Sequence, residues 1–242
     1  MTGPDSAGQL DGPALSRPVV LRLLVVLAAA SGCIDVFCVT RLGGFFASVI
    51  TGNLVQLGHA VVTTKTQLMA GGATAVGGYA LGVAGGTLPL RRLGSGWGRR
   101  TAGVAVVQSV LLACVAAGWC VTGGRPGYAF GLALLGAASA ASGVQSVITL
   151  SAGIRGAATT YLTGSLTKVV RDAVLDPHRI TAGAGGISRL LGLFGGAVLG
   201  ALTLTVAPRW APALAAALVV AVVVVAVGLA WRDATTERGR HG

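Results

Sequence analysis

The chain has 242 residues, of which 53% are hydrophobic and only 10% are charged. Soluble domains usually carry about 25% charged residues, so this composition excludes an ordinary soluble protein. Several apolar runs approach or exceed about 18 residues, which predicts a membrane protein with several spans. The net charge of +11 does not predict nucleic-acid binding, because the basic residues stand between apolar runs, where they set topology and meet anionic lipid. The expected partner is therefore the lipid bilayer.

In chain order, residues 1–17 are rich in Gly, Pro and Ser and predict a disordered tail. A single membrane domain is expected over 18–231, followed by a polar tail over 232–242. Six long apolar runs within that domain predict membrane-spanning helices. They cover about 18–40, 68–90, 101–121, 128–150, 187–206 and 212–231.

Two further apolar segments, 42–62 and 154–175, each contain a Thr-Gly-polar triplet. Gly is costly inside a helix, while Thr, Ser and Asn compete for backbone hydrogen bonds. Each segment is therefore predicted to be a broken or re-entrant helix. The triplets are Thr51-Gly52-Asn53 and Thr163-Gly164-Ser165.

The chain also contains an internal repeat, with matching motifs in the same order in both halves. The Thr-Gly triplets lie 112 residues apart, and Ser31-Gly32 matches Ser142-Gly143 at an offset of 111. Two runs of glycines at four-residue spacing match at an offset of 114: Gly78, Gly82 and Gly86, and Gly192, Gly196 and Gly200. These glycine stripes are predicted to serve close helix packing. The pattern predicts a duplication, with one repeat over 18–121 and the other over 127–231.

The positions of the basic residues favour one topology. If the two Thr-Gly segments do not cross the membrane, 14 of the 18 Lys and Arg residues fall inside; if both cross, only 11 do. The positive-inside rule thus favours six spans over eight, with both termini and residues 91–100 in the cytoplasm. Three spans per half give the halves opposite orientations. The predicted fold is an all-α protein of the inner (plasma) membrane, built from two inverted three-span repeats, each with a broken or re-entrant Thr-Gly segment.

The motifs resemble those of a known family. Gly32-x-x-Asp35-Val36-Phe37, Gly43-Gly44-x-Phe46 and Thr51-Gly52-Asn53 in the first half resemble the YoaK family of bacterial membrane proteins. In the second half, the resembling motifs are Gly143-x-Gln145, Arg155, Thr159-Thr160-Tyr161 and Thr163-Gly164. The resemblance covers about 23–231 and implies a membrane location and fold, but no substrate.

Asp35 is the first candidate functional residue. An ionised carboxylate in hydrocarbon is costly, so Asp35 predicts either a proton or cation site or a structural polar contact near the outer face. Both interpretations stay open. The Thr-Gly triplets likewise predict either a ligand site or packed kinks. Because inverted segments insert from opposite faces of the membrane, the two Thr-Gly triplets are expected to meet at the centre of the molecule, beside Asp35 and Gln145.

The predicted substrate-binding residues are Asp35, Thr51, Gly52, Asn53, Gln145, Thr163, Gly164 and Ser165, with Arg155 and Tyr161 as weaker candidates. No catalytic triad, HExxH motif or phosphate-binding loop is found, so no enzyme activity, metal or cofactor is expected. The four cysteines are interpreted as small buried apolar residues. The predicted function is a small-solute or ion transporter or channel. The alternative is a non-transporting scaffold or stress-response protein, and homo-oligomer formation is left open.

Overall fold

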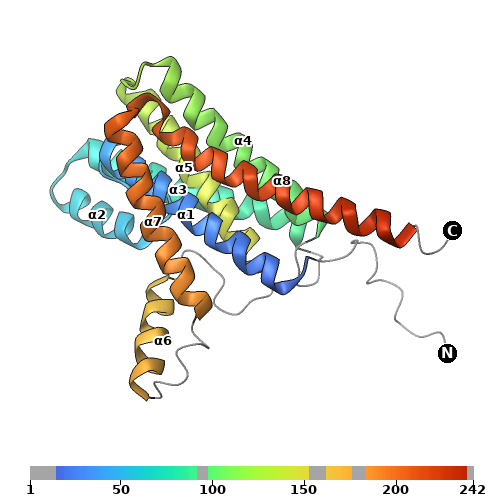
Figure 1. Cartoon of the computed structure of the whole chain (residues 1–242). Helices are drawn as coiled ribbons and strands as arrows, with labels where there is room; N and C mark the ends of the chain where they lie inside the picture. The colour runs from blue at the N-terminus through green and yellow to red at the C-terminus, as the bar shows by residue number, and fades with distance from the viewer. Residues whose placement is uncertain (1–14, 92–97, 153–161, 176–183, 239–242) are drawn as a thin grey trace, which may run out of the picture.

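The computed structural model describes residues 15–91, 98–152, 162–175 and 184–238, and every regular element in these ranges is helical. Figure 1 shows the long helices gathered into one bundle, with two short helices at its side. The elements are α1 (Arg17–Arg41), α2 (Ile50–Val62), α3 (Thr66–Leu90), α4 (Arg99–Val121), α5 (Tyr128–Ser151), α6 (Leu162–Leu175), α7 (Ala184–Val206), the 3₁₀ turn η3 (Pro208–Trp210) and α8 (Ala211–Arg238).

Six of the described helices are long and apolar enough to cross a membrane, which confirms the predicted number. A helix of 25 residues such as α1 is about 37 Å long, more than the hydrocarbon thickness of about 30 Å. By contrast, α2 has 13 residues and α6 has 14, so each reaches only about 20 Å. Neither short helix can span the bilayer.

The first break in the chain lies earlier than the sequence predicts. Thr51 and Asn53 stand in the first turn of α2, not at an interruption within a helix. The chain leaves α1 at Gly43 and Gly44, whose φ angles are +90° and +88°, a conformation that side chains with a Cβ rarely adopt. The second Thr-Gly pair is likewise in the first turn of α6, and the predicted break before it falls outside the described residues.

The glycine stripes bring pairs of helices into close contact. A Cβ at Gly82 of α3 would lie 2.0 Å from the carbonyl oxygen of Ala140 in α5, and one at Gly196 of α7 would lie 2.0 Å from that of Ala29 in α1. Small residues allow this approach in lipid, where packing rather than the hydrophobic effect joins helices. Further along, Gly200 faces Cys33, so α1 and α7 run in the same direction. The predicted packing role of the stripes is confirmed.

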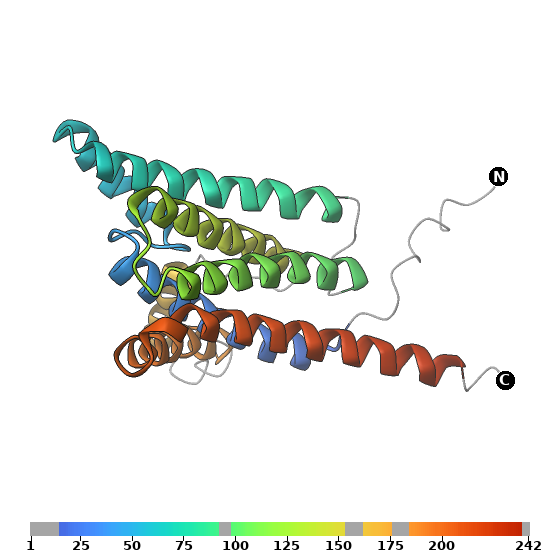
Figure 2. The ribbon, with the colours of Figure 1, turned by 90° about the horizontal axis from the view of Figure 1, so that it is seen from above.

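The bundle has two distinct ends. At one, called here the basic end, α1 begins, α3 ends, α4 begins and α8 ends, as Figure 2 shows from above. At the other, called here the loop end, the Trp119 indole N–H donates to the Pro208 carbonyl oxygen at 2.8 Å. This bond joins the end of α4 to η3. The two chain ends of the described membrane domain therefore lie on the same side, as the six-span topology requires.

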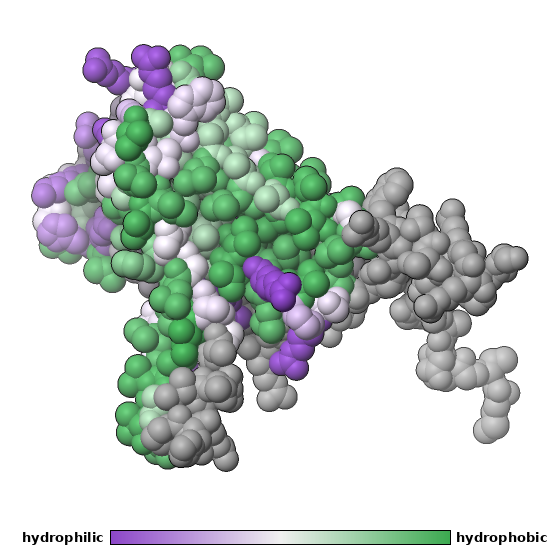
Figure 3. Space-filling model, viewed as in Figure 1, coloured by the Kyte–Doolittle hydropathy of each residue, from purple (hydrophilic) through white to green (hydrophobic). Residues whose placement is uncertain are grey.

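The surface carries a broad apolar zone between these ends. In Figure 3, hydrophobic residues dominate the middle of the visible face, whereas hydrophilic residues gather toward its ends. This distribution suits a molecule surrounded by lipid.

One predicted boundary differs: α8 continues through Arg238, so the C-terminal tail expected from residue 232 begins as helix. The predicted N-terminal tail lies almost wholly outside the described residues.

Candidate functional site

Asp35 fastens the loop that joins α1 to α2, referred to below as loop 42–49. Its side chain is 7% exposed. One carboxylate oxygen accepts a hydrogen bond from the Ser48 backbone N–H at 2.8 Å, and the other accepts one from the Ser48 hydroxyl at 2.5 Å. Hydrogen bonds to a carboxylate are the stronger kind. This geometry matches the interpretation of Asp35 as a structural polar contact.

Asn53 fastens the same loop from the side of α2. It is fully buried, and its amide makes two bonds with the backbone of Phe46. The Asn53 oxygen accepts from the Phe46 N–H at 2.9 Å, and the Asn53 nitrogen donates to the Phe46 carbonyl at 2.7 Å. Gln56, one turn further, donates to the Gly44 carbonyl at 3.2 Å. These side chains satisfy backbone groups that the irregular loop leaves unpaired.

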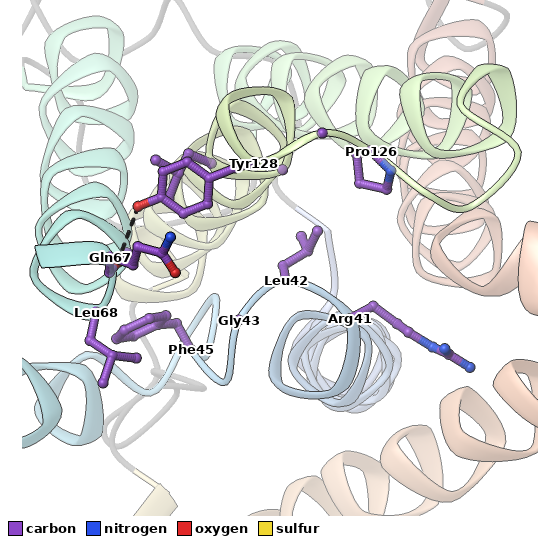
Figure 4. A pocket seen from close by; sticks show the side chains of 12 residues that line it. Arg41, Leu42, Gly43, Phe45, Gln67, Leu68, Pro126 and Tyr128 are labelled. Carbon is purple, nitrogen blue, oxygen red and sulfur yellow. Dashed lines mark hydrogen bonds between the residues drawn. The ribbon is translucent and has the colours of Figure 1, made fainter. Parts of the chain in front are cut away.

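Phe45 anchors loop 42–49 to α3. It is 2% exposed, and a Cβ at Gly71 would lie 2.3 Å from the Phe45 ring, so any larger residue there would displace the ring. Beside this contact, at the loop end, lies a pocket of about 240 Å³ between the loop and the first turns of α3 and α5. In Figure 4, Tyr128 reaches across to α3, where its hydroxyl donates to the Gln67 carbonyl oxygen at 3.3 Å, and Arg41 points away from both.

A second group of polar side chains lies in the core of the bundle. This polar cluster consists of Ser31 on α1, Gln108 on α4 and Gln145 on α5, each at most 3% exposed. The Gln145 amide nitrogen donates to the Ser31 hydroxyl at 2.7 Å and to the Leu27 carbonyl at 3.0 Å. The Gln108 nitrogen donates to the Gln145 oxygen at 2.6 Å. Three helices from both halves of the chain thus meet at uncharged polar groups.

One atom of the polar cluster has no partner. The Leu27 carbonyl can only accept, so the Gln145 amide must point its nitrogen toward it. The Gln145 oxygen then needs a donor, so Gln108 must point its own nitrogen toward Gln145. The Gln108 Oε1 atom is then buried without a hydrogen bond to any residue that the structure describes. An unpaired buried carbonyl costs about 1–3 kcal/mol. A bound donor would remove this cost.

The predicted site residues therefore fall into three places. Asp35 and Asn53 meet at loop 42–49, whereas Gln145 belongs to the polar cluster. Thr163 and Gly164 are exposed on α6, which packs against α7, while α2 packs against α3. The described contacts do not bring the two Thr-Gly triplets together, and Thr51 is exposed beside Gly52. Arg155 and Tyr161 lie outside the described residues.

Sequence reasoning missed Gln108, Ser48 and Phe45. Gln108 is an amide near the middle of an apolar helix, and that alone could have marked it, because polar side chains inside membrane spans usually face a partner or a cavity. Ser48 and Phe45 give no such signal. Their roles depend on the fold of loop 42–49, which sequence periodicity does not describe.

No curated protein and no solved structure matches the chain. A family model does match, over residues 23–225, which is most of the chain. Its description is that of a protein of unknown function, so the match supports the predicted resemblance to an uncharacterised family and supplies no activity. With six helices able to cross a membrane, the protein is a helical membrane protein that belongs to the DUF1275 family.

Proposed function

We propose that the protein is a transporter or channel for a small polar solute in the bacterial cell membrane. The observation that carries this proposal is the polar cluster with its unpartnered Gln108 Oε1 atom. Polar groups inside a membrane bundle are costly and commonly mark a substrate pathway. A scaffold needs packed helices only, and apolar residues in place of the whole polar cluster would pack without leaving a carbonyl unpaired.

We place the solute path between the loop end and the polar cluster, along one face of α1. The Leu27 carbonyl, Ser31 and Asp35 follow one another at four-residue spacing, so they lie on one face of α1. Asp35 holds Ser48 of loop 42–49, and the same loop lines the pocket through Leu42, Gly43 and Phe45. The path thus runs from the pocket, past loop 42–49, to Ser31 and Gln108. Loop 42–49 acts in this proposal as the gate at the loop end.

The packing supports an inverted repeat. Two pairs of contacts correspond between the halves. In the first pair, Gly82 approaches Ala140 and Gly196 approaches Ala29. In the second pair, Gly143 approaches the Tyr79 carbonyl oxygen and Gly32 approaches the Leu193 carbonyl oxygen. The partners in each pair of contacts are related by the offsets of the sequence motifs. Each half thus packs its second long helix, α3 or α7, against the first helix of the other half. Inverted repeats that enclose a site at their contact are the plan of many secondary transporters.

The chemistry of the polar cluster restricts the solute. The group that needs a partner is a carbonyl oxygen, so the solute must present an N–H or O–H group, or a positive charge. Ser31, Gln108 and Gln145 carry no charge, and they provide no cation to balance an anion. A small amide, alcohol or ammonium-like solute fits this arrangement, whereas an anion does not.

The proposed orientation places both termini in the cytoplasm, because the basic end then meets the positive-inside rule. We also propose membership in the YoaK group of bacterial membrane proteins, on the motifs given above. It is consistent with a location in the bacterial inner membrane.

A flux screen on purified protein in liposomes tests the proposal. The probes are urea, glycerol and methylammonium as donor-bearing solutes, potassium as a bare cation and chloride as an anion, each compared with protein-free vesicles. We expect faster entry of at least one donor-bearing solute or cation and none of chloride. Rates equal to those of protein-free vesicles for all five probes would contradict the proposal and favour a non-transporting scaffold.

A further inference from the structure

Arg189 is a buried cation on α7 that the proposed solute path does not use. Its side chain is only 5% exposed. It stands on the face of α7 that packs on α1: a Cβ at Gly185 would lie 3.8 Å from a methyl carbon of Leu21, and one at Gly192 would lie 2.8 Å from the Val25 carbonyl oxygen. Arg189 lies between these two contacts, so its side chain faces the first turns of α1.

The guanidinium of Arg189 has no partner among the described residues. Its Nε atom is buried without a hydrogen bond, and no described residue forms an ion pair with it. Both carboxylates whose side chains the structure describes are occupied elsewhere. Asp35 accepts from Ser48, and Asp172 pairs with Lys168 on α6.

The position makes this positive charge especially costly. Arg189 lies five residues after the start of α7 at Ala184, within the apolar length of a helix that can cross the membrane. A buried guanidinium without a counter-ion is strongly disfavoured. Packing does not require an arginine there, because the residue at the corresponding place of α3, at the offset of 114, is the fully buried Ala75. The site is therefore built for a negative charge that the described chain does not supply.

We propose that Arg189 binds a phosphate group at the basic end of the bundle, between the first turns of α1 and α7. A guanidinium offers two parallel N–H donors, which match the oxygens of a phosphate better than those of a halide. Arg189 is about 8 Å from the start of α7 along the helix axis, close to the level of lipid headgroups. Basic pockets between spanning helices on the cytoplasmic side are known to hold anionic headgroups. The phosphate comes either from an anionic lipid or from solution.

Native mass spectrometry and thermal unfolding of the full-length protein in detergent distinguish these sources. The probes are phosphatidylglycerol, phosphatidylcholine and inorganic phosphate. The variants are Arg189→Gln, Arg189→Lys and, as a matched control, Arg209→Gln, which changes an exposed arginine at the opposite end. We expect phosphatidylglycerol to bind the wild type and to raise its Tm, with about tenfold weaker binding to Arg189→Gln and unchanged binding to Arg209→Gln.

Binding of inorganic phosphate that depends on Arg189 in the same way would support the phosphate site with a soluble source. Arg189→Lys keeps the charge but loses the planar fork, so it folds like the wild type and binds with intermediate affinity. This variant keeps the test valid should Arg189→Gln fail to fold. Two outcomes would overturn the proposal. In the first, the wild type and Arg189→Lys bind each probe with the same affinity. In the second, the wild type binds neither phosphatidylglycerol nor inorganic phosphate.

Discussion

Asp35 and Ser48 are joined by two hydrogen bonds, one to the Ser48 backbone and one to its hydroxyl, although 13 residues separate them in the chain. Asp35 lies in the second half of α1, near the end that leads into the loop, while Ser48 is the last residue but one before α2. The pair therefore fixes where loop 42–49 returns to the bundle.

Replacing Asp35 by Asn is expected to destabilise the protein by about 1–3 kcal/mol, because the neutral amide cannot form the charge-assisted bonds that the carboxylate accepts from the Ser48 N–H and hydroxyl. Ser48→Ala removes only the hydroxyl bond and should cost less. Thermal unfolding of the purified variants measures both, with Thr40→Val on the same helix as control, since the Thr40 hydroxyl bonds only its own helix. Additive losses in the double variant would show that the pair is not coupled.

Asn53→Ala is expected to cost about 1–3 kcal/mol, since it leaves both the N–H and the carbonyl of Phe46 unpaired in a partly buried place. Thr51→Ala is the matched control: Thr51 is in the same turn of α2 but exposed, so its replacement should change stability by less than about 0.5 kcal/mol. Equal unfolding temperatures for the two variants would contradict the structural role of Asn53.

Gly82→Ala and Gly196→Ala are expected to prevent proper packing of α3 on α5 and of α7 on α1, because each new Cβ would lie 2.0 Å from a backbone carbonyl oxygen. Backbone cannot move aside cheaply, so folded yield should fall sharply. Gly85→Ala and Gly195→Ala on the same helices meet no atom within 4 Å and should be neutral or slightly stabilising. Size-exclusion profiles in detergent compare the four variants, and similar profiles for all would refute the close approach.

The topology predicts a simple labelling pattern. Cysteines placed in residues 91–100 and at either terminus should resist a membrane-impermeant reagent in intact cells, whereas one in the turn at Thr122–Gly127 should react. The background replaces Cys114 and Cys120, which are at least partly exposed. External labelling of the 91–100 connection, with the Thr122–Gly127 turn protected, would reverse the orientation.

The sequence predicted the helical spans well because length and apolarity act locally. The glycine stripes of α3 and α7 also predicted close helix packing, since four-residue spacing places small residues on one face of a helix. Loop 42–49 could not be predicted in the same way. Its shape depends on Gly43 and Gly44 at positive φ and on Asn53 reaching back to Phe46, which are contacts of a folded chain. The Thr-Gly triplets were correctly marked as departures from long membrane-spanning helices. They were expected to meet at the centre, but they lie on two short helices that pack on different neighbours, α2 on α3 and α6 on α7.

The most direct test of transport through the polar cluster is the flux of the responsive solute through liposomes that contain Gln108→Leu. Leu fills a similar volume but removes the carbonyl acceptor, so the account predicts at least a tenfold lower flux at equal protein content. Ser109→Ala is the matched variant on the same helix. Its hydroxyl is buried but bonds only its own helix, to the Ala105 carbonyl at 2.9 Å, and its flux should equal that of the wild type. Undiminished flux through folded Gln108→Leu would contradict the central claim.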